Sequence, residues 1–242
     1  RSLMLGLGNS LSLGGAPSEF NILETSPELW WKFNTGQSSA DQDADGDADV
    51  LWTDQAGNYN GVGGFISSIV DAKEGSFSNG AWLSADDSDF LRVGDESLVL
   101  ADAFTIFIVF TNHNADDTFL GGDGDFMRFR NDGRARFRFG DDGNTNQVEH
   151  TYSETPKTGK QLFKIERNGV DEMTITQNRT TTLVDEQSTQ TESFLVKRGP
   201  FGATGIGDGS LFELVIYNTA LNDADSRAVE KDILARTGLE ED

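Results

Sequence analysis

Residues 104–110 read Phe104-Thr-Ile-Phe-Ile-Val-Phe110, and this stretch governs how the rest of the chain is interpreted. β-Branched and aromatic side chains fit a pleated, buried surface, so a β-strand is expected here. Even-numbered residues place Phe104, Ile106, Ile108 and Phe110 on one face, and the other face holds Phe107 and Val109. A strand that is apolar on both faces is covered on both sides. We therefore expect it near the middle of a layered structure.

A β-hairpin is predicted next. Residues 126–130 and 134–139 flank Asn131-Asp132-Gly133, and a three-residue loop ending in Gly suits a type I turn closed by a left-handed glycine. From Met127 on, strict alternation assigns one face to the core: Met127, Phe129, Ala135, Phe137 and Phe139. The opposite face carries five arginines: Arg128, Arg130, Arg134, Arg136 and Arg138. At least one sheet is therefore expected to have a solvated, cationic face.

Composition narrows the class of protein. The chain has 242 residues, 27 Gly, 4 Pro and no Cys, which fits one large β domain without disulfides or thiolate chemistry. Its net charge of −22 argues against nucleic acid as a partner, because phosphate contacts need basic patches. No apolar run approaches the roughly 20 residues of a membrane helix, so no membrane partner is expected.

The remaining chain reads as short strands punctuated by Gly, Asn and Asp. Strands are expected at residues 29–33, 50–52, 81–83, 90–93, 118–120, 148–152, 162–166, 173–176, 193–196 and 211–217, whereas residues 38–49 are not expected to form a strand. Such spacing indicates a sandwich or jelly roll. One helix is expected after an Asn222 cap, with Ala228, Val229, Ile233 and Leu234 as its apolar stripe and Gly238 at its end. We expect this helix to plug one end of the sandwich.

Residues 1–20 form a predicted N-terminal arm ahead of a domain over residues 21–242. Leucines alternate there with Gly and Ser and give one apolar edge: Leu3, Leu5, Leu7, Leu11 and Leu13. Two interpretations stay open. The arm is either a first strand of the domain's own sheet or a strand added to a neighbouring subunit.

The C-terminal region carries a family resemblance. This region resembles the last strand and the C-terminal helix of laminin-G-like, concanavalin A-like domains. The matching segments are the strand Phe212-Glu-Leu-Val-Ile-Tyr217, the cap Ala220-Leu-Asn-Asp223 and a helix ending at Gly238-Leu239. Leu51-Trp-Thr-Asp-Gln-Ala-Gly-Asn58 is similar to the W-x-D-x-x-G-N turn of that family. The resemblance implies an all-β, concanavalin A-like jelly-roll sandwich of two antiparallel sheets with one C-terminal helix. The arm also resembles structural proteins of tailed bacteriophages.

Catalytic patterns are missing from the sequence. Glucan-cleaving enzymes of this fold carry clustered acids such as E-x-D-x-E on one strand, which supply acid and nucleophile. Here Glu166 and Glu213 each stand alone in a predicted strand, and neither histidine has a recognisable catalytic partner. We therefore expect no enzyme.

An acidic loop is a candidate metal site. Asp41, Asp43, Asp45, Asp47 and Asp49 surround Gly46 as in the first half of a D-x-D-x-D-G calcium loop. The twelfth position holds Trp52 instead of a bidentate Glu, and Asp54 is the nearest substitute. The loop predicts either a Ca²⁺ site or a solvated acidic segment.

The five hairpin arginines also leave two interpretations open. In the first interpretation they pair across strands with Glu149, Glu166 or Glu172, and each pair adds little to the stability of the sheet. Alternatively, their guanidinium groups dock the carboxylates of an acidic partner or stack on sugar rings.

Three functions of different classes follow. The first is a non-enzymatic virion structural protein: a capsid decoration or outer-surface component of a tailed bacteriophage, at the virion surface. It would bind other virion or capsid subunits and glycans, and form a homo-oligomer. The alternative is an extracellular, lectin-like carbohydrate-binding module with exposed aromatic residues such as Trp52 and Trp82. A glycan-cleaving enzyme is the disfavoured third, because paired acids are missing.

Overall fold

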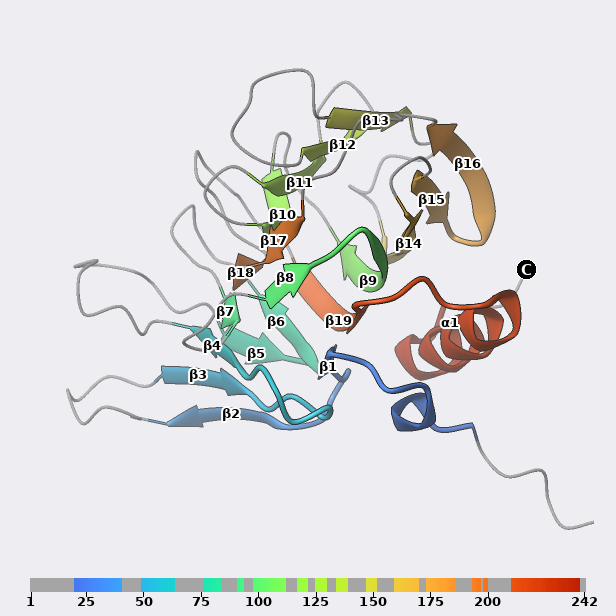
Figure 1. Cartoon of the computed structure of the whole chain (residues 1–242). Coiled ribbons are helices and arrows are strands. Elements are labelled where there is room, and N and C mark those ends of the chain that lie inside the picture. The colour runs from blue at the N-terminus through green and yellow to red at the C-terminus, as the bar shows by residue number, and fades with distance from the viewer. Residues whose placement is uncertain are drawn as a thin grey trace, which may run out of the picture.

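The computed structural model of the chain describes residues 20–40, 49–63, 76–83, 91–93, 98–111, 117–121, 125–129, 134–138, 147–151, 159–169, 173–185, 193–196, 198–199 and 210–239. These residues form two large antiparallel sheets, a small third sheet and one α-helix on the outside (Figure 1). The predicted all-β, concanavalin A-like jelly-roll sandwich with one C-terminal helix is confirmed. No helix in the described part of the chain is long and apolar enough to cross a membrane.

The first sheet has eight strands in the order β16-β15-β14-β9-β19-β6-β5, with β1 also paired to β19. Their bounds are β1 Leu29–Trp31, β5 Ser76–Ser78, β6 Ala81–Leu83, β9 Ala103–Thr111, β14 Gln161–Asn168, β15 Met173–Gln177, β16 Thr180–Asp185 and β19 Ser210–Tyr217. The predicted central strand, β9, lies between β14 and β19, with Ile106 in register with both Ile165 and Ile216.

The second sheet has nine strands in the order β13-β12-β11-β10-β18-β7-β4-β3-β2. Their bounds are β2 Gln37–Ala40, β3 Asp49–Trp52, β4 Gly61–Gly63, β7 Leu91–Val93, β10 Asp117–Gly121, β11 Phe126–Phe129, β12 Arg134–Arg138, β13 Gln147–Thr151 and β18 Arg198–Gly199. β8 Leu98–Leu100 and β17 Phe194–Val196 form a separate pair. The prediction that residues 38–49 contain no strand is wrong at both ends, because Ser38 to Ala40 pair with Asp49 to Leu51.

The main core lies between the two large sheets and is rich in aromatic rings. Trp31 and Trp52 stack with ring centroids 6.0 Å apart, and Phe137 packs on Phe194 at 5.6 Å. Trp52 and Trp82 are completely buried, so their prediction as exposed, sugar-stacking aromatics is wrong. Alternation along β3 and β6 places both rings on the inner face, where aromatic burial stabilises the sandwich.

A second core lies on the outer face of the first sheet. Phe107 and Val109 of β9 point away from the main core and pack with Val229, Ile233 and Leu234 of α1 (Asp223–Thr237). The prediction that β9 is covered on both faces is confirmed. The helix covers a sheet face rather than plugging an end of the sandwich, because β9, β14 and β19 all present apolar residues outward.

The ends of α1 follow the predicted capping pattern. The Asn222 side chain accepts the N–H groups of Ala224 and Asp225, each at 3.0 Å. Gly238 ends the helix with φ +70°, and the N–H of Leu239 donates to the carbonyl of Leu234. A 3-10 turn, η1 (Ile22–Thr25), lies beside the helix and adds Ile22 to the outer core (Figure 1).

Candidate functional site

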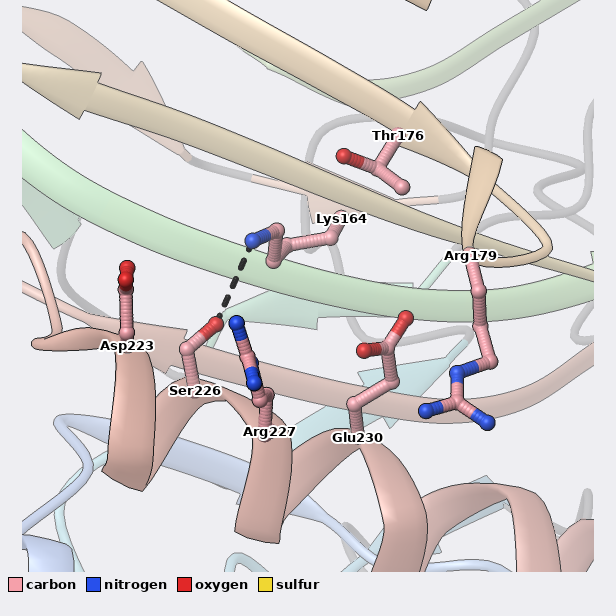
Figure 2. A pocket seen from close by; sticks show the side chains of 7 residues that line it. All are labelled: Lys164, Thr176, Arg179, Asp223, Ser226, Arg227 and Glu230. Carbon is pink, nitrogen blue, oxygen red and sulfur yellow. Dashed lines mark hydrogen bonds between the residues drawn. The ribbon is translucent and has the colours of Figure 1, made fainter. Parts of the chain in front are cut away.

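A polar pocket of ≈ 320 Å³ lies where α1 crosses the outer face of β14 and β15; we call it the helix–sheet pocket. Figure 2 shows the helix side chains rising toward Lys164 and Thr176, with Arg179 reaching in from the turn after β15. The lining residues are Lys164, Thr176, Arg179, Asp223, Ser226, Arg227 and Glu230. Three cations and two carboxylates thus line one pocket in a chain whose net charge is −22.

Two different periodicities bring these side chains together. On β14, Phe163 and Ile165 face the main core, so Lys164 between them faces the helix. Thr176 is the register partner of Lys164 on β15. On α1, Ser226 and Glu230 are four residues apart and therefore share the face that looks at the sheet. Lys164 Nζ donates to Ser226 Oγ at 3.3 Å and lies 3.7 Å from Glu166.

Arg179 holds an unfavourable backbone conformation. It forms a two-residue hairpin turn with Asn178, with φ +45° at Asn178 and +67° at Arg179, between the paired residues Gln177 and Thr180. Such turns prefer Asn-Gly, because glycine adopts positive φ without steric cost. An arginine at the glycine position points to a use for its side chain, which is exposed at the rim of the pocket.

Glu230 is the unusual group of the pocket. The residue is only 8% exposed. Among the described residues, no hydrogen bond or ion pair engages its carboxylate, which Figure 2 shows directed into the space below Lys164. Burial raises the pKa of Glu230, and the charges of Lys164, Arg179 and Arg227 oppose that shift. The carboxylate oxygens reach solvent through the pocket, so they can accept hydrogen bonds from the hydroxyl groups of a ligand.

The chemistry of the pocket is therefore complementary to a small polar ligand with an anionic group. Arg179 and Arg227 are exposed cations that suit a carboxylate or sulfate. Glu230 and Asp223 are acceptors for hydroxyl groups, and Thr176 and Ser226 add hydroxyls of their own.

The strands of the predicted arginine hairpin, β11 and β12, pair in the second sheet, whereas the helix–sheet pocket lies on the first sheet. Met127 pairs with Phe137 on the buried side, and Arg128 pairs with Arg136 on the opposite side. Arg128, Arg136 and Arg138 are partly exposed; Arg134 lies in β12, and Arg130 lies outside the described residues. Glu149 is in register with Arg136, as one interpretation required. Glu166 is not a cross-strand partner, because β14 belongs to the first sheet, and Glu172 lies outside the described residues.

The predicted calcium loop and arm are not placed by the structure. Asp41, Asp43, Asp45 and Asp47 lie outside the described residues, as do residues 1–19, and Asp49 begins β3. The Ca²⁺ site, the arm and its role in assembly remain predictions. In the part of the chain that is described, no three His, Cys, Asp or Glu residues are grouped to hold a metal. The suggestion that Asp54 completes the loop is wrong, because both of its oxygens accept backbone N–H groups.

The residues of the helix–sheet pocket were not predicted from the sequence. Lys164 looks like an ordinary polar residue of a half-exposed strand, and Glu230 like one of many helix acids. Two signals were present in the sequence: Arg179 follows Asn178 where glycine is preferred, and Glu230 interrupts the apolar stripe between Val229 and Ile233.

Comparison with known proteins shows the fold alone. No protein-family model and no curated protein sequence matches this chain. The botulinum neurotoxin serotype D binding domain superposes with a TM-score of 0.57 at 14% identity, covering 89% of this chain and 54% of that one. The same kind of domain solved with N-acetylneuraminic acid gives 0.58 at 14%, with the same coverage. Trypanosoma rangeli sialidase gives 0.56 at 11%, covering 98% of this chain and 37% of that one.

This chain corresponds to only part of each of these proteins. The chain spans about half the length of the neurotoxin binding domain and little more than a third of the sialidase. Their ligands and activities belong to larger proteins, and only the β-sandwich is shared.

Proposed function

We propose that this protein is a glycan-binding module that holds an acidic sugar in the helix–sheet pocket and does not cleave it. The observation that carries the proposal is the grouping of Lys164, Arg179 and Arg227 around Glu230, whose carboxylate lines the pocket. The fold supports it, since a neurotoxin binding domain with the same sandwich was solved with N-acetylneuraminic acid, which carries a carboxylate and several hydroxyls.

Cleavage is the weaker alternative, although the pocket contains two carboxylates. Asp223 and Glu230 are seven residues apart on α1, which separates their backbones by about 10 Å. Retaining glycosidases hold their carboxyl groups roughly 5 Å apart, and inverting ones hold them at roughly 6.5–9.5 Å. Cleavage is the weaker alternative because the sequence carries no paired acids on one strand, the arrangement that supplies acid and nucleophile in glucan-cleaving enzymes of this fold.

The setting of the module remains a separate proposal. The arm and the hairpin arginines still favour a virion-surface protein that binds neighbouring subunits, and an extracellular lectin-like module uses the same pocket. Neither setting changes the chemistry proposed for the ligand.

The proposal is tested by isothermal titration with N-acetylneuraminic acid and with the neutral sugar N-acetylmannosamine. We expect binding of the acidic sugar only, and Arg227→Gln should weaken it roughly tenfold or more, because a charge-assisted contact is lost. Lys231→Gln is the matched control, since Lys231 is exposed on the same helix outside the pocket. Equal affinity for both sugars, or equal loss in the control, would contradict the proposal. Release of free sugar from a sialylated substrate would favour cleavage.

Arg179 allows stability and binding to be separated. Arg179→Gly relieves the positive φ, so the free energy of unfolding should stay unchanged or rise by about 0.4–1 kcal/mol. Binding of the acidic sugar should fall nonetheless. A variant that loses stability while binding normally would mean that Arg179 serves the turn and not a ligand.

A further inference from the structure

A second pocket, of ≈ 580 Å³, lies between α1, the 3-10 turn η1 and β1, and we call it the η1 pocket. Figure 1 shows η1 beside the helix on this side. Arg227 and Arg236 are nine residues, or two and a half turns, apart, so they project from opposite sides of α1. The lining residues used below are Phe20, Asn21, Trp30, Lys32, Asp232 and Arg236, and none of them lines the helix–sheet pocket.

Trp30 forms a fixed wall of the η1 pocket. Its backbone N–H donates to Asp54 at 2.7 Å, and its indole N–H donates to Glu213 at 2.8 Å. The ammonium of Lys32 lies 4.9 Å from the centre of the Trp30 ring, and the guanidinium of Arg236 lies 5.3 Å from it. An aromatic face attracts a cation, so the ring positions the Lys32 ammonium at the pocket.

The two cations of the η1 pocket differ in how their charge is balanced. Arg236 pairs with two carboxylates, those of Glu213 and Asp232. Lys32 makes no hydrogen bond or ion pair within the described residues, where the Trp30 ring is its one electrostatic partner. The chain has 41 Asp and Glu residues against 19 Lys and Arg, so a lysine that pairs with none of the described acids is unusual. An uncompensated positive charge therefore remains at Lys32.

Hydrogen-bond donors also outnumber acceptors in the η1 pocket. Lys32 keeps all three N–H donors, and Asn21 keeps both amide N–H groups, because only its Oδ1 is used, by the N–H of Leu23 at 3.1 Å. Arg236 engages carboxylates through Nε, Nη1 and Nη2, which leaves one N–H on each terminal nitrogen. Asp232 is the carboxylate that lines the pocket, and one of its oxygens is already bound to Arg236. A ligand rich in acceptors therefore fits.

We propose that the η1 pocket binds a small monocarboxylate with an apolar body, and that Lys32 holds its carboxylate. A carboxylate offers about four acceptor sites and no donor, which matches the donors of Lys32, Asn21 and Arg236. A phosphate group brings a charge of roughly −1.5 to −2 and fits less well beside Asp232. Phe20 is partly exposed at the pocket and offers apolar surface to the body of the ligand.

The test follows the indole N–H resonance of Trp30 by NMR while 3-phenylpropanoate is added to the full chain. We expect a saturable shift of this resonance, and none with 3-phenylpropanamide, which lacks the charge. The indole resonances of Trp52 and Trp82, in the main core, are the internal references. Lys32→Gln should weaken binding roughly tenfold or more, because a charge-assisted contact is lost. Lys32→Arg, which keeps the charge, and Arg227→Gln, in the helix–sheet pocket, should bind as the wild type does.

Four results would overturn the proposal. An unchanged Trp30 resonance at millimolar 3-phenylpropanoate would exclude this class of ligand. Equal binding of the acid and the amide, or wild-type binding by Lys32→Gln, would show that the charge of Lys32 is not the contact. Tighter binding of phenyl phosphate would assign the pocket to phosphate ligands. Binding lost in Arg227→Gln and kept in Lys32→Gln would place the carboxylate in the helix–sheet pocket instead.

Discussion

Asp54 shows how one side chain organises a loop. Its Oδ1 accepts the N–H groups of Trp30 at 2.7 Å and Ala56 at 2.9 Å, and its Oδ2 accepts those of Asn58 at 2.9 Å and Tyr59 at 2.8 Å. The carboxylate thus ties the turn after β3 to β1. This accounts for the aspartate in the W-x-D-x-x-G-N pattern, while Gly57 of the same turn takes φ +88°.

Asp54→Ala should therefore destabilise the fold strongly. Four backbone donors lose a charged acceptor, and at least one is left buried, so we expect a loss of roughly 3 kcal/mol or more in the free energy of unfolding. Urea unfolding measures the loss, with Gln55→Ala in the same turn as the control. A loss below about 1 kcal/mol would mean that water replaces the carboxylate.

Tyr217 is a second residue with a testable role, because the pKa of its hydroxyl links stability to pH. Its hydroxyl lies 2.9 Å from Thr25 Oγ1, and burial raises its pKa from 10.0 to about 12. The folded state therefore holds the phenolic proton more tightly than the unfolded state does. The resulting stability is fully present below pH 10 and is lost as the pH rises toward 12.

We expect the free energy of unfolding to fall by roughly 2 kcal/mol over this alkaline range through Tyr217 alone. Tyr217→Phe should remove that part of the pH dependence. Phenolate absorbance in the native protein gives the midpoint directly. A native Tyr217 that titrates near 10 would contradict the assignment.

At the element scale, α1 is attached to the sheet by a buried ion pair as well as by apolar packing. Glu213 of β19 is completely buried and accepts from Trp30 Nε1 at 2.8 Å and Arg236 Nη2 at 2.6 Å. Arg236 also pairs with Asp232 one turn earlier, and its guanidinium lies 5.3 Å from the Trp30 ring. Burial raises the pKa of Glu213, and Arg236 opposes that shift. Glu213, which stood alone in the sequence, thus has a structural partner.

Removing one partner of this ion pair should lower the free energy of unfolding more than replacing both partners by apolar residues. Arg236→Met leaves Glu213 buried without a counter-charge, with an expected loss of roughly 3–5 kcal/mol. The double variant Glu213→Leu with Arg236→Met should recover most of that loss, since apolar groups of similar volume often replace a buried pair. Urea unfolding of the single and double variants provides the comparison. Equal stability of Arg236→Met and the wild type would show that the pair contributes nothing.

At the scale of the whole molecule, charge is distributed unevenly. The net charge is −22, yet three cations, Lys164, Arg179 and Arg227, line the helix–sheet pocket. The excess of acids elsewhere repels itself across the compact fold. Binding of an anionic ligand in the helix–sheet pocket therefore works against the overall charge and depends on short-range contacts with these cations.

Salt should accordingly stabilise this protein. Raising the NaCl concentration from 0.01 to 0.1 M shortens the screening length from about 30 to 10 Å and weakens repulsion among acids. We expect the melting temperature to rise by a few degrees in differential scanning calorimetry. A melting temperature that falls with salt would show that ion pairs such as Glu213–Arg236 outweigh the repulsion.

The sequence alone was sufficient to predict those elements whose position follows from the pattern of side chains within one segment. Phe104–Phe110 is apolar on both parities, so its central, doubly covered position followed from period two. Asn222 and Gly238 mark the ends of α1 because capping is a local interaction. The alternation of arginine and phenylalanine in residues 127–138 assigned each to a face for the same reason.

Tertiary structure decided everything that depends on which distant segments meet. Alternation assigns Trp52 and Trp82 to one face of their strands, but only the packing of the two sheets against each other makes that face the buried one. Lys164 and Glu230 are 66 residues apart and meet because α1 lies across β14. Arg92 and Arg198 are 106 residues apart and become neighbours through strand register alone. Side-chain periodicity is a property of one segment, whereas a binding surface is a property of several, and their relative placement is determined by long-range packing.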